Sequence, residues 1–581
     1  MFIYKEKDTF NSRLETLKNK LKYVYIARLV LGITLIVALI CYFTLDFNYI
    51  YLTLSIALLL GFIFIVCYFR KDYDLEKYYK NVLLEYDKHE ARRTGKVKSS
   101  LGFFDKGNEF KKRFSKLSLR DKYLIEDIDI FGNNSLYQNI NQAKSVLGRE
   151  TLAYNLIHGE ETFDEHSRDN LAKKAYALGH DERLVEVEAA LDFNKVEEEM
   201  NYETYLSNLD SKYNFNKNNM FLFIGIIAID IIILLLSILT KNYLYFIFIP
   251  IINIFYSFTK KNDLEIVDPS KIYSSLEKYN LVLTYLSSID LRDIDSKLDN
   301  YDKYIKDIKK AKLLWQMVSY KRNILYKILI NTILPLETLF EMLFNKRMPN
   351  INNLDECFKK VAYVELLASY ANVAADYNST VGVLGDTLEF TDLANPLVKD
   401  CVPNDFKYTK GVILTGSNMS GKTTFMRTIG INLLLFNANC PVLATSFKTP
   451  KYLVYTSLRI KDELSSGVST FYAEIEKIRE IVGKNKYHKF CLIDEIFKGT
   501  NTLDRIYGAK KLVEKLESIG EDFIISTHDF ELCNITTTIN YHFEELYNED
   551  YSKISFDYKL KEGPSHSTNA IFLLKSSHII D

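Results

Sequence analysis

TGSNMSGKTTF, residues 415–425, contains a glycine-rich turn. Residues 416–423 fit the pattern G-x-x-x-x-G-K-[ST]; the apolar run GVIL precedes them and TTFMRTIGINLLLF, a helical pattern, follows. A glycine-rich turn between a strand and a helix lets backbone N–H groups surround phosphate oxygens, and the helix N-terminus favours their negative charge. Only 22 of the 581 residues are glycine, so a chance match would be rare. The stretch therefore predicts a phosphate-binding loop.

The residues of this loop have distinct expected roles. Lys422 is expected to reach the β and γ phosphate oxygens of ATP, and the Thr423 hydroxyl is expected to hold Mg²⁺. The predicted nucleotide-binding residues are Gly416, Ser417, Asn418, Met419, Ser420, Gly421, Lys422, Thr423 and Thr424.

Two later strands are expected to bring further polar groups to the same sheet edge. KFCLIDE (489–495) ends in Asp494, which suits the Mg²⁺ shell, and Glu495, which suits a base that polarises the attacking water. DFIIST (522–527) delivers His528, for which we expect contact with the γ-phosphate, because open α/β sheets bind ligands at the carboxyl ends of their strands. The alternatives are an ordinary charged turn and a structural histidine.

Four apolar runs organise the rest of the chain. They form two pairs, each joined by a short polar turn: residues 23–43 with 49–69, and residues 220–239 with 243–258. The first three are long enough to cross ~30 Å of hydrocarbon as helices, and the fourth is marginal. We expect two transmembrane hairpins. Asp230 lies in mid-span, where a packing contact with Asn253 is expected and a proton-relay role is the alternative.

Positive charge sets the expected orientation. Lysines and arginines flank the outer ends of both pairs, whereas the connecting turns carry only Lys241. The positive-inside rule then places both termini and the bulk of the chain in the cytoplasm, as a multi-pass protein of the cell membrane.

Composition limits the partners and cofactors. Lys+Arg is 74 against Asp+Glu 75, which gives no global argument for nucleic acid, and the 7 scattered cysteines show no zinc-type spacing. One local exception is Lys88–Lys122, with twelve Lys/Arg against four Asp/Glu. Anionic lipid is its expected partner, because the stretch follows the second apolar run; DNA contact through residues such as Arg92, Arg93, Lys111, Lys112 and Arg113 is the alternative.

Three segments around the loop carry a family resemblance. DELSSGVSTFYAEIEKIREIV (462–482), DEIFKGTNTLDR (494–505) and STHDFEL (526–532), together with the Asn-Met pair of the loop, resemble the MutS family of DNA mismatch-repair ATPases. VPND (402–405), YKLKEGPSHSTNAIFLL (558–574) and, more weakly, residues 135–159 extend the resemblance. It implies an α/β P-loop ATPase domain of the ABC/MutS type at the C-terminus, preceded by an all-α core and lever region.

The resemblance also implies a dimer. In that family a Ser-Thr pair completes the ATP site of the partner subunit, and by similarity Ser469 and Thr470 take this role. Asp504 resembles the dimer-contact loop after the acidic strand. The implied partners are a second copy of the chain and DNA; ATP and Mg²⁺ are the implied cofactors.

The expected organisation has six parts. They are a cytoplasmic segment (1–22), hairpin one (23–69), a helical region (70–219) that resembles the MutS core from about 130, hairpin two (220–258), a lever-like helical region (259–390) and the ATPase domain (391–581). Nothing before residue 130 resembles a mismatch-recognition domain.

These patterns predict a membrane-anchored MutS-like ATPase that acts on DNA. Two alternatives remain open: a membrane scaffold that remodels a protein partner without DNA, and an ATP-driven half-transporter, because LSSGVS resembles the transporter signature LSGGQ. The sequence identifies neither the nucleic-acid structure nor the pathway.

Overall fold

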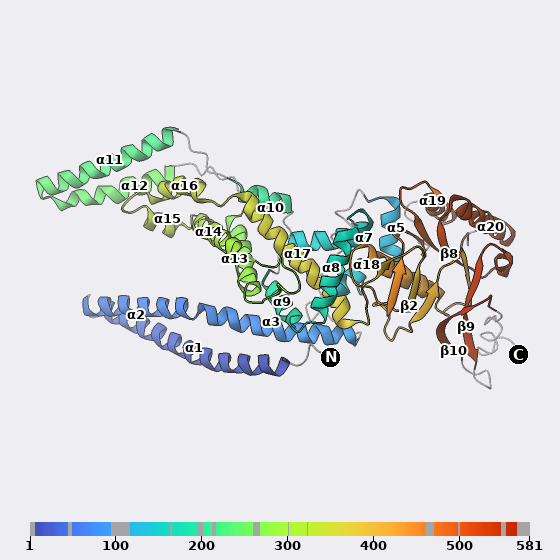
Figure 1. Ribbon diagram of the computed structural model, residues 1–581. Coiled ribbons are helices and arrows are strands. Elements are labelled where there is room, and N and C mark those ends of the chain that lie inside the picture. Colours follow the sequence, from blue (N-terminus) through green and yellow to red (C-terminus); the bar gives the residue numbers. More distant parts are fainter. Residues whose placement is uncertain are drawn as a thin grey trace. The chain divides into compact units, whose positions relative to one another are not determined.

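The computed structural model divides into two compact units, which are described separately (Figure 1). The first comprises residues 1–142, 150–189 and 366–581, and the second comprises residues 143–149 and 190–365. The structure describes residues 6–44, 49–94, 117–162, 165–194, 202–211, 217–259, 268–299, 301–321, 323–459, 470–497, 500–547 and 554–565.

The N-terminal part of the first unit is helical. Its helices are α1 (Lys7–Thr44), α2 (Tyr49–Tyr68), α3 (Arg70–Arg93), α5 (Leu119–Asp127), α6 (Leu136–Ile140), α7 (Val146–Thr162), α8 (Glu165–Gly179), α9 (Arg183–Leu191) and the C-terminal part of α17 (Ile351–Asp376). Helix α1 packs along both α2 and α3, and Lys20 forms an ion pair with Asp72 at 2.8 Å. The first two apolar runs therefore form a helical pair that continues into α3.

The second unit is also helical. Its elements are the 3₁₀ helices η2 (Asp192–Asn194) and η3 (Tyr243–Ile247) and the helices α10 (Tyr202–Leu209), α11 (Lys217–Thr240), α12 (Phe248–Thr259), α13 (Pro269–Leu286), α14 (Tyr301–Tyr320), α15 (Ile324–Ile330), α16 (Leu336–Arg347) and the first part of α17. The core of this unit includes the fully buried Trp315, which meets Phe344 edge to face at 5.6 Å.

Among the described residues, three helical segments are long and apolar enough to cross a membrane. They are Lys7–Thr44, Tyr49–Arg93 and Met220–Thr240, and their apolar windows are almost entirely exposed. The fourth run is different: it begins as the 3₁₀ helix η3, and α12 then has only 12 residues, about 18 Å. Asn253 of α12 donates a hydrogen bond to Asp230 of α11 at 3.1 Å, which confirms the expected contact between these two residues.

The C-terminal part of the first unit holds two sheets. The larger has the strand order β10-β9-β4-β8-β7-β6, parallel except for β10, and the smaller has the order β1-β5-β2-β3. The strands are β1 (Val383–Leu384), β2 (Glu389–Leu393), β3 (Asn404–Lys407), β4 (Val412–Thr415), β5 (Ser446–Thr449), β6 (Leu453–Ser457), β7 (Lys489–Asp494), β8 (Asp522–Ser526), β9 (Ile539–Tyr547) and β10 (Ile554–Glu562). This mixed α/β architecture confirms the predicted class of the C-terminal domain.

Helices cover the larger sheet. They are α18 (Lys422–Asn437), α19 (Thr470–Val482) and α20 (Thr502–Ile519), and the short 3₁₀ helix η4 (Phe530–Asn534) follows β8. Cys491 and Ile493 of β7 pack with residues of α19 and α20, whereas a Cβ on Gly430 of α18 would lie 3.2 Å from Leu492. Alternate residues of one strand therefore face helices from opposite sides, which explains why the central strands are almost continuously apolar.

The prediction of a lipid-binding surface over Lys88–Lys122 is wrong for three of its cations. Lys88, Arg92 and Arg120 are only 3%, 4% and 7% exposed. Lys88 pairs with Glu85, and the Arg120 guanidinium lies 2.6 Å from the Glu160 carboxylate. Each buried cation has a carboxylate partner, as a charge out of contact with water requires. Residues 95–116 of this stretch lie outside the described residues.

Candidate nucleotide-binding site

The glycine-rich loop has a backbone that only glycine fits well. Gly416 and Gly421 have φ angles of +138° and +112°, and a Cβ on Gly416 would lie 2.6 Å from the backbone oxygen of Phe543. The loop follows β4, whose four residues are all buried, and Gly421 is the N-cap of α18. The tight turn thus places the first N–H groups of α18 at the carboxyl edge of the sheet.

Lys422 folds back over the loop. Its Nζ donates hydrogen bonds to the carbonyl oxygens of Gly416 and Ser417, at 2.7 and 2.8 Å. The Ser420 hydroxyl donates to the Ser417 carbonyl at 2.9 Å, and Met419, with a φ angle of +70°, is 86% exposed. The side chain of Lys422 is otherwise buried, so its charge is held inside the loop.

Asp494 lies between two hydroxyl groups from different elements. Thr423 Oγ1, at the start of α18, donates to Asp494 Oδ2 at 2.5 Å, and the Ser526 hydroxyl, at the end of β8, donates to Asp494 Oδ1. Asp494 pairs with Ser526 in the parallel register of β7 and β8, which accounts for the second contact. The structure thus brings the two predicted Mg²⁺ ligands, Thr423 and Asp494, into direct contact.

Glu495 and His528 form a second polar group at this edge. His528 Nε2 lies 3.1 Å from Glu495 Oε1 and 3.0 Å from Asn418 Oδ1 of the loop. Glu495 has a φ angle of +49°, and its N–H donates to the Ser526 carbonyl at 3.1 Å. A left-handed conformation is costly for a glutamate, and here a hydrogen bond to the neighbouring strand supports it.

The turn after β7 is anchored to the helix that follows the Ser-Thr segment. Glu474 of α19, 4% exposed, accepts a hydrogen bond from the backbone N–H of Phe497. Ser469 lies outside the described residues, and Thr470 is the first residue of α19, with a side chain that is also outside the described part of the chain. The geometry of the predicted Ser-Thr pair is therefore not part of the described site.

The sequence led us to expect Asp504 in a loop, but the structure places it in a helix. It belongs to the first turn of α20, where Asn501 is the N-cap and accepts a hydrogen bond from the Asp504 N–H at 2.9 Å. The next residue, Arg505, forms a two-pronged ion pair with Asp529 at 2.6 and 2.7 Å, and these hydrogen bonds raise the pKa of the guanidinium. This pair fixes the start of α20 beside the strand end that carries His528.

A cavity of about 430 Å³ opens beside the loop. Its lining includes Lys422, Thr423 and Glu495, one wall made by residues 398–402, and two aromatic side chains, Phe543 and Tyr558. Its size and mixed lining suit a drug-sized or nucleotide-sized ligand. Among the predicted loop residues, Ser417, Asn418, Met419, Gly421, Lys422, Thr423 and Thr424 line the cavity.

Sequence reasoning missed the aromatic wall. Tyr558 sits where the register between β9 and β10 shifts, with a φ angle of +52°, and Asn404 of β3 donates a hydrogen bond to its carbonyl oxygen at 2.9 Å. A bulge redirects a side chain from the regular alternation of a strand. No local pattern marks the bulge, so only the strand pairing identifies Tyr558 as part of the site.

Comparisons with known proteins agree with this geometry. The family model for MutS domain V matches residues 412–579. The chain is 28% identical over 246 residues to the DNA mismatch repair protein MutS of Geobacillus sp. (strain WCH70), which covers 39% of this chain and 28% of that protein. It is 28% identical over 223 residues to the DNA mismatch repair protein MutS of Thermus aquaticus, with 38% and 28% covered.

A third relative is the DNA mismatch repair protein MutS 2 of Halobacterium salinarum, 27% identical over 236 residues, with 38% of this chain and 27% of that protein covered. The chain thus spans less than a third of the length of these curated relatives. The similarity lies where the loop, the acidic strand end and the cavity lie. Residues 412–579 of this chain therefore match domain V of the MutS family.

Proposed function

We propose that this chain is a membrane-anchored ATPase that binds ATP·Mg²⁺ in the cavity beside the glycine-rich loop and hydrolyses it in a site shared between two copies. The contact of Asp494 with the hydroxyl groups of Thr423 and Ser526 carries the proposal. It joins the end of one strand, the end of its neighbour and the first turn of α18 at one point, as phosphoryl-transfer chemistry requires.

The residues present fit a magnesium ion. Mg²⁺ takes oxygen ligands and is commonly held by one or two protein side chains, with phosphate and water completing the shell. Thr423 and Asp494 supply a hydroxyl and a carboxylate oxygen that already lie 2.5 Å apart. When bound, the ion would neutralise charge on the β and γ phosphate oxygens.

The side chains around this pair divide the remaining tasks. Lys422 supplies a positive charge to the phosphates, and the N–H groups at the start of α18 supply hydrogen-bond donors. Glu495 accepts the proton of the attacking water, and His528, 3.1 Å from the carboxylate, orients it and lies beside Asn418 of the loop. Tyr558 and Phe543 supply an aromatic surface for the adenine ring of ATP.

Exposed apolar side chains around the site support the proposal that a second copy of the chain binds there. Met419, Leu503 and Tyr507 are 86%, 81% and 66% exposed, and all three lie on the loop or on the first turns of α20. Such residues are unfavourable in water and common where another protein surface covers them. Ser469 and Thr470 of the second copy are the residues that would complete the phosphate site, by their resemblance to the family pattern.

We propose that the ATPase acts on DNA. The curated relatives are named DNA mismatch repair proteins, and residues 412–579 of this chain match domain V of the MutS family. Burial of Lys88, Arg92 and Arg120 removes three cations from the surface available for DNA, and this specific observation favours the scaffold alternative, in which the lever helices move a protein partner.

A binding measurement separates the two functions. Detergent-solubilised protein is titrated with duplex, branched and single-stranded DNA at several salt concentrations. Contacts to phosphates give an affinity that falls steeply with salt, and changing Lys111, Lys112 and Arg113 to glutamine lowers the slope by up to about three if these cations contact DNA. Neutralising the half-buried Lys510 and the exposed Lys511 and Lys515 of α20 is the matched control. Weak, salt-independent binding of every DNA would reject DNA as the substrate and leave the scaffold.

A further inference from the structure

Residues 324–343 of the second unit show an inverted pattern of burial. The apolar side chains of Ile324, Leu325, Leu329 and Ile333 are 64%, 70%, 76% and 76% exposed. In the same segment Asn331 and Glu337 are 0% and 4% exposed. A water-soluble helix pair buries its leucines and exposes its carboxylates; this pair does the opposite.

Helix α16 shows the inversion as two stripes. Its buried side chains include Glu337, Glu341 and Phe344, which recur with helical spacing on one face. Leu336, Leu339 and Leu343 recur in the same way and are 38%, 41% and 40% exposed. The polar face therefore points into the protein and an apolar face points outward.

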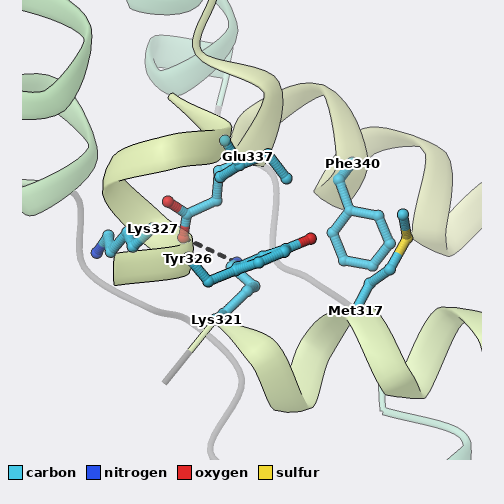
Figure 2. A pocket seen from close by; sticks show the side chains of 7 residues that line it. Met317, Lys321, Tyr326, Lys327, Glu337 and Phe340 are labelled. Carbon is cyan, nitrogen blue, oxygen red and sulfur yellow. Dashed lines mark ion pairs between the residues drawn. The ribbon is translucent and has the colours of Figure 1, made fainter. Parts of the chain in front are cut away.

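The buried polar groups form a connected interior. Lys321, directly after α14, lies 3.2 Å from Glu337 (Figure 2). It also lies 2.5 Å from Glu341. Asn331 donates hydrogen bonds to Ser257 of α12 at 3.1 Å and to Glu337 at 3.2 Å. Each charge in this interior has a partner of opposite sign, which is the condition for holding carboxylates away from water.

Two hydrogen bonds from one side chain fix the depth of the turn between α15 and α16. The side-chain amide of Asn253 donates both to Asp230, at 3.1 Å, and to the backbone oxygen of Ile333, at 3.2 Å. Asp230 lies ten residues from either end of the apolar segment Met220–Thr240, about 15 Å along a helix. Ile333 is therefore level with the centre of that segment.

Two backbone groups at this turn are satisfied by side chains of the protein. The Asn253 side-chain amide donates a hydrogen bond to the Ile333 carbonyl, and the Glu337 N–H donates one to the Asn331 side chain at 3.2 Å. Irregular backbone is tolerated at membrane depth only where protein groups replace the hydrogen bonds of water. The Ile333 carbonyl and the Glu337 N–H meet this condition.

We propose that residues 324–343 enter the bilayer as a re-entrant hairpin that reaches the membrane centre at Ile333 and packs against α12. Its occupant is lipid hydrocarbon, because its exposed apolar surface continues that of α11 and α12. Helix α15 has 7 residues and α16 has 12, about 10 and 18 Å, so neither crosses the full ~30 Å of hydrocarbon. The hairpin enters and leaves on one side, with the Lys321–Glu337 pair nearer the water.

This inference rests on membrane insertion of α11, which is part of the proposed function, and a depth measurement tests the two separately. Trp315 is the single tryptophan of the chain, so Trp315→Phe provides a background for placing one tryptophan at a time. Ile333→Trp probes the turn, Ile232→Trp probes exposed α11, and Val383→Trp, at an exposed position of β1, is an aqueous control. Each full-length protein is reconstituted in vesicles whose lipids carry bromine at a known acyl depth, with ATPase activity as the check of folding.

The expected result is quenching of Ile333→Trp by deeply placed bromines to the same extent as Ile232→Trp, within about twofold, with Val383→Trp unquenched. Quenching at Ile232→Trp without quenching at Ile333→Trp would overturn the hairpin and leave the anchor intact. Absence of quenching at both would overturn both.

A measurement on the unchanged protein avoids the tryptophan background. Vesicle lipids with a photoreactive group in the acyl chain should label peptides from residues 324–343 together with those from α11. Labelled α11 with unlabelled 324–343, together with cross-linking between Leu329→Cys copies, would assign this surface to a second copy of the chain and overturn the lipid assignment.

Discussion

Asp127 holds the backbone of Arg459: its Oδ1 accepts a hydrogen bond from the Arg459 N–H at 3.1 Å. Oδ2 of the same carboxylate accepts from the Leu458 N–H at 3.0 Å, and Lys477 of α19 lies 3.6 Å away. Asp127, at the end of α5, is 1% exposed. One buried carboxylate therefore fixes the chain on both sides of residues 460–469, the segment that carries the Ser-Thr pair.

Replacing Asp127 with alanine should lower both stability and turnover. The buried Leu458 N–H and the partly buried Arg459 N–H lose a charged acceptor. Each loss lowers the free energy of unfolding by up to about 3 kcal/mol. We expect a lower melting temperature and an ATPase kcat reduced by roughly tenfold, with ATP affinity nearly unchanged because the loop is untouched. Asp129→Ala is the matched control, since that carboxylate is 38% exposed and binds the Arg459 side chain. Equal effects of the two substitutions would show that the buried contact has no special role.

The sequence predicted the centre of the site better than its walls. The motif at 416–423 and the acidic end of 489–495 are local patterns, and a parallel sheet brings strand ends together by its topology. Tyr558 depends on a bulge, and the buried Arg92 depends on Asp376, a partner far along the chain, so neither has a local signal. Residues 324–343 escaped notice because their carboxylates interrupt the apolar run, and only the fold shows that these face inward.

The buried cluster around His89 should make stability depend on pH. Burial alone would lower the His89 pKa, but the carboxylates of Asp376 and Glu188, both 2.8 Å from the ring, raise it from 6.5 to about 9. The folded protein binds this proton more tightly than the unfolded chain does, so protonated His89 stabilises the folded state. The contribution is complete below pH 6.5 and is lost as the pH rises through about 9. The free energy of unfolding in detergent should fall over this window.

His89→Gln should flatten that slope and lower stability most at pH 6.5, while His180→Gln, at an exposed position, should leave the slope unchanged. A pH slope that survives His89→Gln intact would show that other groups cause it.

Glu495→Gln should separate binding from hydrolysis. The substitution keeps the size of the side chain and its contact distance to His528 but removes the base, so hydrolysis should slow by at least about 100-fold. ATP binding should persist, and an ATP-held dimer should accumulate on size exclusion. Glu514→Gln, at an exposed position of α20, is the control. Undiminished hydrolysis would remove Glu495 from the reaction.

The predicted topology can be tested with an impermeant thiol reagent on intact cells. Asp46→Cys, in the turn between the first two apolar runs, should react from outside, because that turn lacks positive charge. Glu90→Cys and Lys511→Cys, both at exposed positions, should react only after lysis. The reverse labelling pattern would invert the orientation.

The central claim is that two copies share one ATP site, and a mixing measurement tests it most directly. Lys422→Ala removes the phosphate charge of its own subunit, and Ser469→Ala removes the group offered to the partner; each variant alone should be nearly inactive. A heterodimer of the two has one site damaged twice and one site intact, so mixtures should recover ATPase activity, up to about half the wild-type rate per dimer if the sites turn over independently. Mixtures that stay inactive at every ratio, although heterodimers form, would contradict the shared site.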